Sequence, residues 1–321
     1  MWIERLLGLE PRPAPPHVFG VEPGRLRYAG FGREGRVHQL REEHAVALDG
    51  SLWAPVHPGF APREVAQMAE RVGELLERVS GGVKQASLVL PDDWLRLAFL
   101  ELGELPRDPG ERDEVLRFKL KRLVPFRVDE LRITAVEVPP LASPQEPVRA
   151  LVGFAAEAGL ARFEEAFERH GVHLGRITNR SLAASAALLA GMADGERDLL
   201  LLSAQAEGFS LVGWQGGSPV LFRQKAVPVD WDEATRAEML VRELRLTRAF
   251  VEERLGDLPL GRVVVAADRS QETAWCDAVT EGLDAEPVPL RAGLLPIAGL
   301  REGSNWVELA PLLGAACEEV E

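Results

Sequence analysis

Apolar and polar residues alternate, or apolar residues run together, in three short segments near the start of the chain. These segments are HVFGVE, RLRYAGF and RVHQLRE, and the Pro-Gly and GREG sequences between them are typical of tight turns. In the following PREVAQMAERVGELLERV, apolar residues recur every three or four positions, which predicts a helix that ends at Gly81 and Gly82. ASLVLP and WLRLAFLEL then predict two strands, the first of them buried.

The same kind of pattern continues through the middle of the chain. GERDEVLRFKLKRL predicts a helix, because its acids come first and its bases last, as the helix dipole favours. VPF ends this helix, since Pro125 restricts the backbone of Val124. LRITAVEV and VRALVGFAA predict strands, and helices over residues 158–170 and about 181–189 flank the strand GVHLGRIT.

A second series then repeats the order of the first. DLLLLSA, GFSLVGWQ and SPVLFRQKAV predict three strands, and residues 233–255 predict a long helix. RVVVAAD, ETAWCDAVTEGL, PVPL and WVELAPLLGAACEEV predict a buried strand, a helix, an edge strand and a final helix. Two successive β-β-β-α-β-α series predict a duplicated α/β fold with a cleft between its halves.

The N-terminal residues 1–16 differ from the rest of the chain. MWIERLLGLE places apolar side chains on one side of a short helix, and PRPAPP forms a stiff spacer after it. Arg5 is the only basic residue of that helix. Packing on the protein's own body or on a partner is therefore favoured over binding to a membrane surface.

Composition and charge narrow the classes of protein. The length of 321 residues suits two domains or two halves of one larger fold. A net charge of -13, with bases scattered among acids, disfavours nucleic acid as a partner. Cys276 and Cys317 lie far apart and indicate neither a disulfide framework nor a CxxC metal site. We expect no signal peptide and no membrane-spanning segment, and hence a cytoplasmic protein.

Motifs of the common catalytic classes are absent. The chain has no GxSxG elbow and no GxGxxG or GxxxxGK[ST] loop. His170 and His173 straddle a helix end with no acid or thiol at ligand spacing, so we expect no metal site there. Asp92 and Asp93 are adjacent at a strand end, where neighbouring side chains point in opposite directions. A turn or a helix cap is favoured over a catalytic pair.

The order of these segments resembles that of the actin-like ATPases, which include actin, the cell-division protein FtsA and sugar kinases. More specifically, the chain resembles the PilM family of type IV pilus assembly proteins. FGVEPGRLRYA is similar to the opening strand-turn-strand, and LVLPDDWLRLAFLELGELP to the strand-Pro-strand segment. EVLRFKLKRLVPFRVDELRITAVEV, LVRELRLTRAFVEERL and APLLGAAC resemble a helix ending in Pro-Phe, the long second-half helix and the closing helix. The resemblance covers nearly the full chain and implies a duplicated, ribonuclease H-like fold.

The resemblance also implies a division into subdomains. Residues 17–85 and 156–192 would form the first actin-like subdomain, and residues 193–321 the second. Residues 86–155 would form an inserted subdomain at the position where FtsA and PilM carry theirs and ordinary actins and kinases have none. That position favours a scaffold of the PilM kind over a small-molecule kinase.

The family holds ATP and magnesium with two Gly-containing hairpins, each carrying an Asp, and both hairpins differ here. In the first, Pro23 removes a backbone donor and Arg25 to Arg27 replace small hydroxyl residues. In the second, LLSAQAEGF lacks the DxG carboxylate and glycine, and RSQETAW replaces a Gly-Gly turn that admits adenosine. We expect a vestigial site without ATP or magnesium, and no catalysis. Its residues are Glu22, Gly24, Arg27, Ser203 and Gln205.

The PilM family binds the short cytoplasmic N-terminal peptide of an inner-membrane protein, PilN, between the first and the inserted subdomain. By resemblance, we expect a non-enzymatic cytoplasmic scaffold that binds a PilN-like partner and other pilus components and meets the inner membrane only through them. An apolar trough with exposed backbone suits peptide recognition. The candidate walls of this trough are Leu88, Leu90, Leu123, Val124, Pro125 and Phe126. For each of these residues, packing in the protein core is the simpler explanation.

Two other interpretations stay open. One is an active ATPase of the same fold, in which Glu22 replaces the usual Asp. The other is the cytoplasmic docking domain of a type II secretion protein of the GspL kind, which normally continues into a transmembrane helix, whereas this chain ends at Glu321 without one. A sugar or acetate kinase is disfavoured by the missing phosphate acids and by the position of the insertion.

Overall fold

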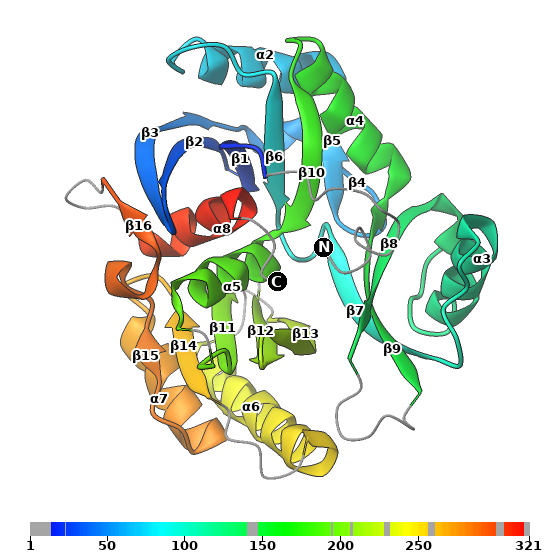
Figure 1. The fold of residues 1–321 in the computed structure, drawn as a ribbon, viewed down its shortest axis with the longest axis vertical. Coiled ribbons are helices and arrows are strands. Elements are labelled where there is room, and N and C mark those ends of the chain that lie inside the picture. The colour runs from blue at the N-terminus through cyan, green and yellow to red at the C-terminus, as the bar shows by residue number, and fades with distance from the viewer. Residues whose placement is uncertain are drawn as a thin grey trace.

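Two halves of like topology and a smaller inserted subdomain make up the fold (Figure 1). The computed structural model describes residues 14–22, 24–139, 147–193, 195–205, 208–227, 232–255, 261–299 and 305–317. The predicted N-terminal helix and Pro23 lie outside the described residues. No helix in the described ranges is long and apolar enough to cross a membrane.

Six strands form the sheet of the first half, in the order β10-β6-β1-β2-β3-β16. They are β1 (His17–Glu22), β2 (Arg25–Glu34), β3 (Val37–Ala47), β6 (Gln85–Leu90), β10 (His173–Asn179) and β16 (Ile297–Ala298). The first three are antiparallel, as the tight turns between them predict, whereas β6 and β10 run parallel to β1. Two helices, α2 (Val65–Leu76) and α4 (Glu157–Glu168), cover the outer face of this sheet. A small hairpin of β4 (Trp53–Pro55) and β5 (Phe60–Pro62) lies beside α4.

Five strands form the sheet of the second half, in the order β13-β12-β11-β14-β15. They are β11 (Leu199–Gln205), β12 (Gly208–Gln215), β13 (Ser218–Ala226), β14 (Arg262–Ala266) and β15 (Val288–Pro289). Helices α6 (Glu233–Leu255) and α7 (Glu272–Leu283) cover its outer face. When the strands of each main sheet are numbered separately in chain order, both sheets contain the order 3-2-1-4-5. This repetition confirms the predicted duplicated α/β fold.

Strand β11 shows how the sequence pattern builds these layers. Side chains alternate between the two faces of a strand, so Leu199 and Leu201 enter the core between the halves while Leu200 and Leu202 pack under α6 and α7. Both faces are covered, which is why the strand reads as a continuous apolar run.

Two helices, α5 (Arg180–Gly191) and α8 (Trp306–Ala316), lie between the sheets and pack on each other (Figure 1). They join the halves: α8 follows the second-half strands but packs against β1, β2 and β6 of the first half. Helix α5 contacts β6 and β10 of the first half as well as β11 and β12 of the second. The contact is close, because a Cβ atom on Gly314 of α8 would overlap the carbonyl oxygen of Ala183 of α5. The halves therefore share one core.

The inserted subdomain has its own core and a three-stranded antiparallel sheet in the order β7-β9-β8. Its elements are β7 (Arg96–Leu102), α3 (Pro109–Leu120), β8 (Leu131–Val138) and β9 (Val148–Ala156). The expected range of 86–155 begins inside β6, which pairs with β1 in the main sheet; the insertion therefore follows β6. Short 3-10 helices lie in three of the described connections: η1 (Gly50–Leu52), η2 (Val128–Glu130) and η3 (Ala292–Leu294).

An ion-pair cluster attaches the insertion to the first half. Arg132 of β8 donates to Glu157 at 2.5 and 2.8 Å and to Glu164 at 2.5 and 3.0 Å, both on α4. The hydrogen bonds from Arg132 hold the pKa of the Glu157 carboxyl below its usual range. The insertion also contacts the second half, where Arg149 of β9 donates to the carbonyl oxygen of Val220 at 3.3 Å.

Candidate functional site

Glu22, at the acid position of the first hairpin, is bonded to the protein itself. β1 and β2 pair up to Glu22 and Arg25. The Glu22 carboxylate accepts a hydrogen bond at 2.5 Å from Arg180, the first residue of α5, and Arg180 also donates to the carbonyl oxygen of Val307 at 2.9 Å. Both charged side chains are largely buried. This carboxylate is therefore committed to an ion pair.

The basic residues of the first hairpin are also paired. Arg27 is 8% exposed and pairs with Glu308, in the first turn of α8, and with Glu43 at 3.6 Å. Arg25 lies 3.9 Å from Glu308. Gly24 is exposed, and a Cβ atom there would meet nothing within 4 Å. A phosphate at this hairpin would have to compete with Glu308 for both arginines.

The second hairpin is bonded to Asp92, which follows β6 of the first half. Gln205, at the end of β11, donates to the Asp92 carboxylate at 2.5 Å and to the Ser210 hydroxyl at 3.2 Å. Asp92 is fully buried and also accepts from the backbone N–H of Ser181 at 2.9 Å and from the Ser181 hydroxyl. Ser203 is buried within β11.

The N-terminus of α5 is where the two hairpins converge. A free helix N-terminus attracts anions, because its first N–H groups have no partner within the helix. Here Asp92 accepts from the N–H of Ser181, and the Asn179 side chain accepts from the N–H of Leu182 at 2.9 Å. The protein's own side chains thus occupy this potential phosphate position.

Asp92 is a structural residue that the sequence analysis did not assign to the site. Asp92 lies in a turn, which the sequence analysis favours, and its carboxylate accepts from the N–H of Ser181 in a helix that begins at Arg180, far along the chain. Gln224 of β13, with its amide oriented to satisfy both partners, donates to the carbonyl oxygen of Asp92 at 3.2 Å and accepts from the N–H of Asp93 at 3.0 Å. One signal was present: Asp92 directly follows the carboxyl end of a buried parallel strand, where polar site residues gather in α/β folds.

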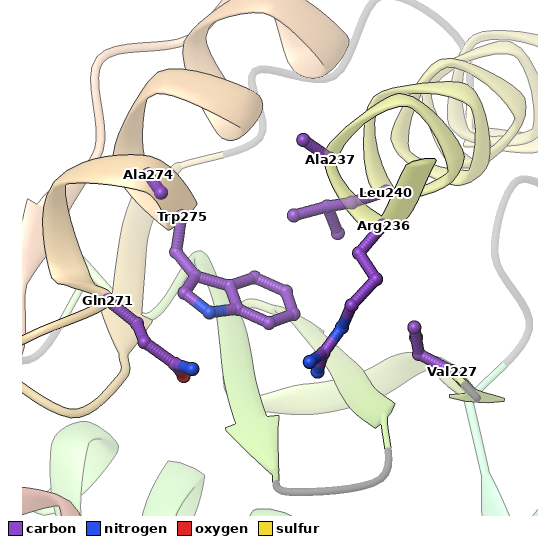
Figure 2. A pocket seen from close by; sticks show the side chains of 7 residues that line it. All are labelled: Val227, Arg236, Ala237, Leu240, Gln271, Ala274 and Trp275. Carbon is purple, nitrogen blue, oxygen red and sulfur yellow. The ribbon is translucent and has the colours of Figure 1, made fainter. Parts of the chain in front are cut away.

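A pocket of about 330 Å³ lies in the second half between the first turns of α6 and α7 (Figure 2). Val227, Leu240 and the indole of Trp275 give it apolar walls, and Figure 2 shows the guanidinium of Arg236 and the amide of Gln271 reaching its sides. Gln271 and Trp275 belong to RSQETAW, the segment expected to block adenosine. This segment lines an open pocket instead of filling the space.

Aromatic residues meet where the inserted subdomain contacts the first half, and we call them the aromatic junction: His57, Phe60, Trp94 and Phe126. The rings of His57 and Phe126 stack with centroids 6.4 Å apart, and those of Phe60 and Trp94 are 5.8 Å apart. Arg96 lies over Phe126 at 5.9 Å. Phe60 is 42% exposed and Phe126 is half-buried, so part of the junction is open to a partner.

The expected groove residues divide into two groups. Leu88 and Leu90 are 0% and 1% exposed, since β6 is a central strand of the first sheet and both side chains point into its core under α2 and α4. Their assignment to a peptide groove was wrong. Leu123 and Pro125 are exposed, whereas Val124 and Phe126 are half-buried against the core of the insertion. Phe126 alone of these six belongs to the aromatic junction.

No group of three or more His, Cys, Asp or Glu side chains in the described part of the chain could hold a metal ion. Of the two cysteines, Cys317 is buried and Cys276 is partly exposed.

No protein-family model and no curated protein matches the chain. The fold is that of the actin-like ATPases: a Bacteroides thetaiotaomicron protein of unknown function, described as having that fold, matches with a TM-score of 0.50 and 8% identity over 86% of this chain and 91% of that one. A chain of the PilM–PilN type IV pilus biogenesis complex is much more similar, with a TM-score of 0.71 and 18% identity over 95% of this chain and 97% of that one. The cytoplasmic domain of EpsL from the Vibrio cholerae type II secretion system matches with a TM-score of 0.46 and 9% identity over 93% of each chain. The predicted resemblance to PilM is thus confirmed at the level of the fold.

Proposed function

We propose that this protein is a non-enzymatic cytoplasmic scaffold of a type IV pilus or related secretion machine, which docks the cytoplasmic tail of a PilN-like inner-membrane protein. The observation that carries the proposal is the state of the two hairpins: Glu22 is bonded to Arg180, and Gln205 to Asp92. The likeness to a chain of the PilM–PilN complex supports this choice among actin-like proteins.

The chemistry of phosphoryl transfer argues against an enzyme. That reaction depends on a positioned metal ion and on donors aimed at the transferred phosphate. Among the described residues of the two hairpins, Glu22 is the only carboxylate at an expected acid position. It forms an ion pair with Arg180. The amides at the start of α5 are held by Asp92 and Asn179. Binding of a nucleotide phosphate would require several of these internal bonds to break.

Nucleotide binding without catalysis is the second candidate, and the pocket beside Trp275 favours it. Its volume and its apolar walls with two polar side chains suit a small planar ligand. The pocket lies on the second half, apart from the ion pair of Glu22. A ligand could therefore enter it without displacing that pair.

Magnesium-ATP and magnesium-ADP at millimolar concentration are expected to raise the melting temperature by less than about 1 °C, because a ligand much weaker than its concentration adds little stability. Differential scanning fluorimetry and calorimetric titration of the full chain would measure this. The control variant is Ala274→Trp, which closes the pocket with a bulky side chain. A magnesium-dependent shift of several degrees that disappears in Ala274→Trp would establish the nucleotide-binding candidate instead.

We place the docked tail at the aromatic junction. Aromatic side chains at the centre of an interface contribute large contact area at low cost in conformational entropy. Phe60 and Phe126 come from two different subdomains, so a peptide between them would contact both. Arg96, beside Phe126, could donate a hydrogen bond to a carbonyl or carboxylate oxygen of the peptide.

Phe60→Ala is expected to weaken binding of a synthetic peptide carrying the N-terminal cytoplasmic residues of the PilN-like protein by about thirtyfold, roughly 2 kcal/mol. Isothermal titration calorimetry would measure the affinity. Phe250→Ala serves as the matched control, because Phe250 is a comparably exposed phenylalanine, 38% against 42%, on α6 of the other half. Equal affinities of the two variants would contradict docking at the aromatic junction.

A further inference from the structure

The end of α3 and the residues after it expose apolar and basic side chains together. Leu123 and Phe118 are 60% and 58% exposed, the highest values among the large apolar residues that the structure describes. Lys119, Lys121 and Arg122 lie between them in sequence. We call these five residues the basic corner. The helix buries its other face, with Leu116 and Leu120, in the core of the insertion.

The charge of this region is opposite to that of the whole protein. Residues 117–127 contain five basic residues and no acid, in a chain of net charge -13. Arg117 pairs with Asp113 and Arg127 with Glu130, but Lys119, Lys121 and Arg122 form no ion pair with any described acid. Arg122 instead lies over the ring of Phe118 at 5.0 Å.

Helix stabilisation explains only part of this pattern. Bases in the last turn of a helix interact favourably with its dipole, which accounts for Arg117 and Lys119. It does not account for Lys121 and Arg122, which lie at and beyond the C-cap, or for two large apolar side chains directed to solvent. An exposed apolar group beside unpaired cations indicates contact with a surface that is both apolar and anionic.

The position of the basic corner fits such a contact. Figure 1 shows α3 at the outer edge of the inserted subdomain, away from both main sheets. The segment that follows it leads back to Phe126, which stacks on His57 in the aromatic junction. The corner is therefore next to the surface where we place the tail of an inner-membrane protein, and that surface has to lie near the bilayer.

We propose that the basic corner binds the anionic phospholipid headgroups of a membrane, with Phe118 and Leu123 entering the boundary between headgroups and acyl chains. Lys and Arg side chains are long enough to reach the phosphates while their methylene groups lie along the apolar side chains. Lipid requires no shaped cavity on the protein, and the corner is a protruding helix end. The expectation that the basic corner lies near the bilayer rests on the proposed function. The observation of exposed apolar and basic side chains is independent of it.

Sedimentation of the full chain with phosphatidylglycerol-rich vesicles and with pure phosphatidylcholine vesicles tests this proposal. We expect binding to the anionic vesicles only, weakened by salt. The triple variant Lys119→Ala, Lys121→Ala, Arg122→Ala is expected to bind about a hundredfold more weakly, since each base near an anionic surface contributes about fivefold. Phe118→Ser with Leu123→Ser is expected to lose roughly tenfold.

A matched control comes from α6, where Leu246 and Phe250 are 47% and 38% exposed. The neighbouring Arg245 and Arg248 are paired with Glu281 and with Glu252, so this patch has the apolar side chains without unpaired cations. Leu246→Ser with Phe250→Ser is expected to leave vesicle binding unchanged. Thermal melting of every variant checks that it is folded. We expect each to fold, because the substituted side chains are exposed except for Lys119, which is half-buried.

Three results would overturn the proposal: no binding to the anionic vesicles, equal binding to both kinds of vesicle, or equal loss in the α6 control. Titration of the same variants with the tail peptide, without lipid, separates it from the proposed function. We expect peptide affinity to be unchanged by the basic-corner substitutions. Loss of peptide affinity with intact vesicle binding would make the corner a protein-binding surface and would also contradict the lipid proposal. If the protein binds anionic vesicles but no tail peptide, the lipid proposal would hold and the proposed function would be contradicted.

Discussion

Gly314→Ala is expected to lower the free energy of unfolding by more than about 3 kcal/mol, or to prevent folding, which would make it one of the most damaging single-methyl additions in the chain. The added Cβ atom would overlap the backbone carbonyl of Ala183 and also approach the backbone nitrogen of Ala187, both on α5. Backbone atoms in the middle of a helix cannot rotate aside as a side chain can. The helices α5 and α8 would have to separate, and the core shared by the two halves would open.

Urea-induced unfolding followed by circular dichroism would measure this change, with soluble yield as the readout where the variant does not fold. Gly293→Ala is the matched control, because a Cβ atom on Gly293 would meet nothing within 4 Å. Its stability is expected to stay within about 0.5 kcal/mol of the unaltered protein. Unaltered stability of Gly314→Ala would mean that α5 and α8 do not pack as closely as described.

Asp92→Ala is expected to lower the free energy of unfolding by about 3 kcal/mol. The substitution removes the acceptor for the N–H and hydroxyl of Ser181 and for the amide of Gln205, in a site with no solvent exposure at Asp92. Buried donors left without a partner keep the full cost of their desolvation. The loss would fall on both halves, since Ser181 lies in the first turn of α5 and Gln205 ends β11.

Asp92→Asn separates the hydrogen bonds from the shape of the side chain. Asparagine keeps one acceptor oxygen for the N–H of Ser181 but turns an NH₂ group toward other donors, so we expect a loss between zero and that of Asp92→Ala. Thermal and urea-induced unfolding at neutral pH would rank the three proteins. The order would be contradicted if Asp92→Ala were as stable as the unaltered protein, because Asp92 would then not hold the two halves together.

These expectations share a physical basis: packing and hydrogen bonds within the protein hold its two halves together. The helices α5 and α8 form a common core, and Gln205 of the second half donates to the Asp92 carboxylate of the first. A scaffold that presents a fixed docking surface gains from such internal bonds, because its binding surface is already ordered before the partner arrives.

Local sequence patterns predicted the elements and their order well. The alternation in β11, the spacing of apolar residues in α2 and the turn residues between β1 and β2 each depend on residues close in sequence. The repeat of three strands, a helix and a strand could be predicted because it also follows from residues close in sequence. The sequence did not show what each strand packs against. The apolar run that includes Leu88 and Leu90 suits a core strand and a groove wall equally well. Only the position of β6 in the middle of the sheet decides between these two interpretations.

The hairpin positions were expected from the resemblance to the actin-like ATPases, but the partners of their side chains could not be predicted. Glu22 and Arg180 are 158 residues apart, and Gln205 and Asp92 are 113 apart. A charged or polar side chain finds such a partner only through the packing of α5 between the sheets, which no local pattern encodes. The pocket beside Trp275 likewise depends on how α6 and α7 lie against each other.

The sequence by itself determined the duplicated series of strands and helices, because hydrophobic periodicity and turn chemistry act over a few residues. The tertiary structure alone decided that α5 and α8 join the halves, that Asp92 bonds to the first turn of α5, and that Phe118 and Leu123 point to solvent beside unpaired bases. These features depend on which apolar faces cover each other, and that choice minimises the exposed apolar area of the whole molecule at once.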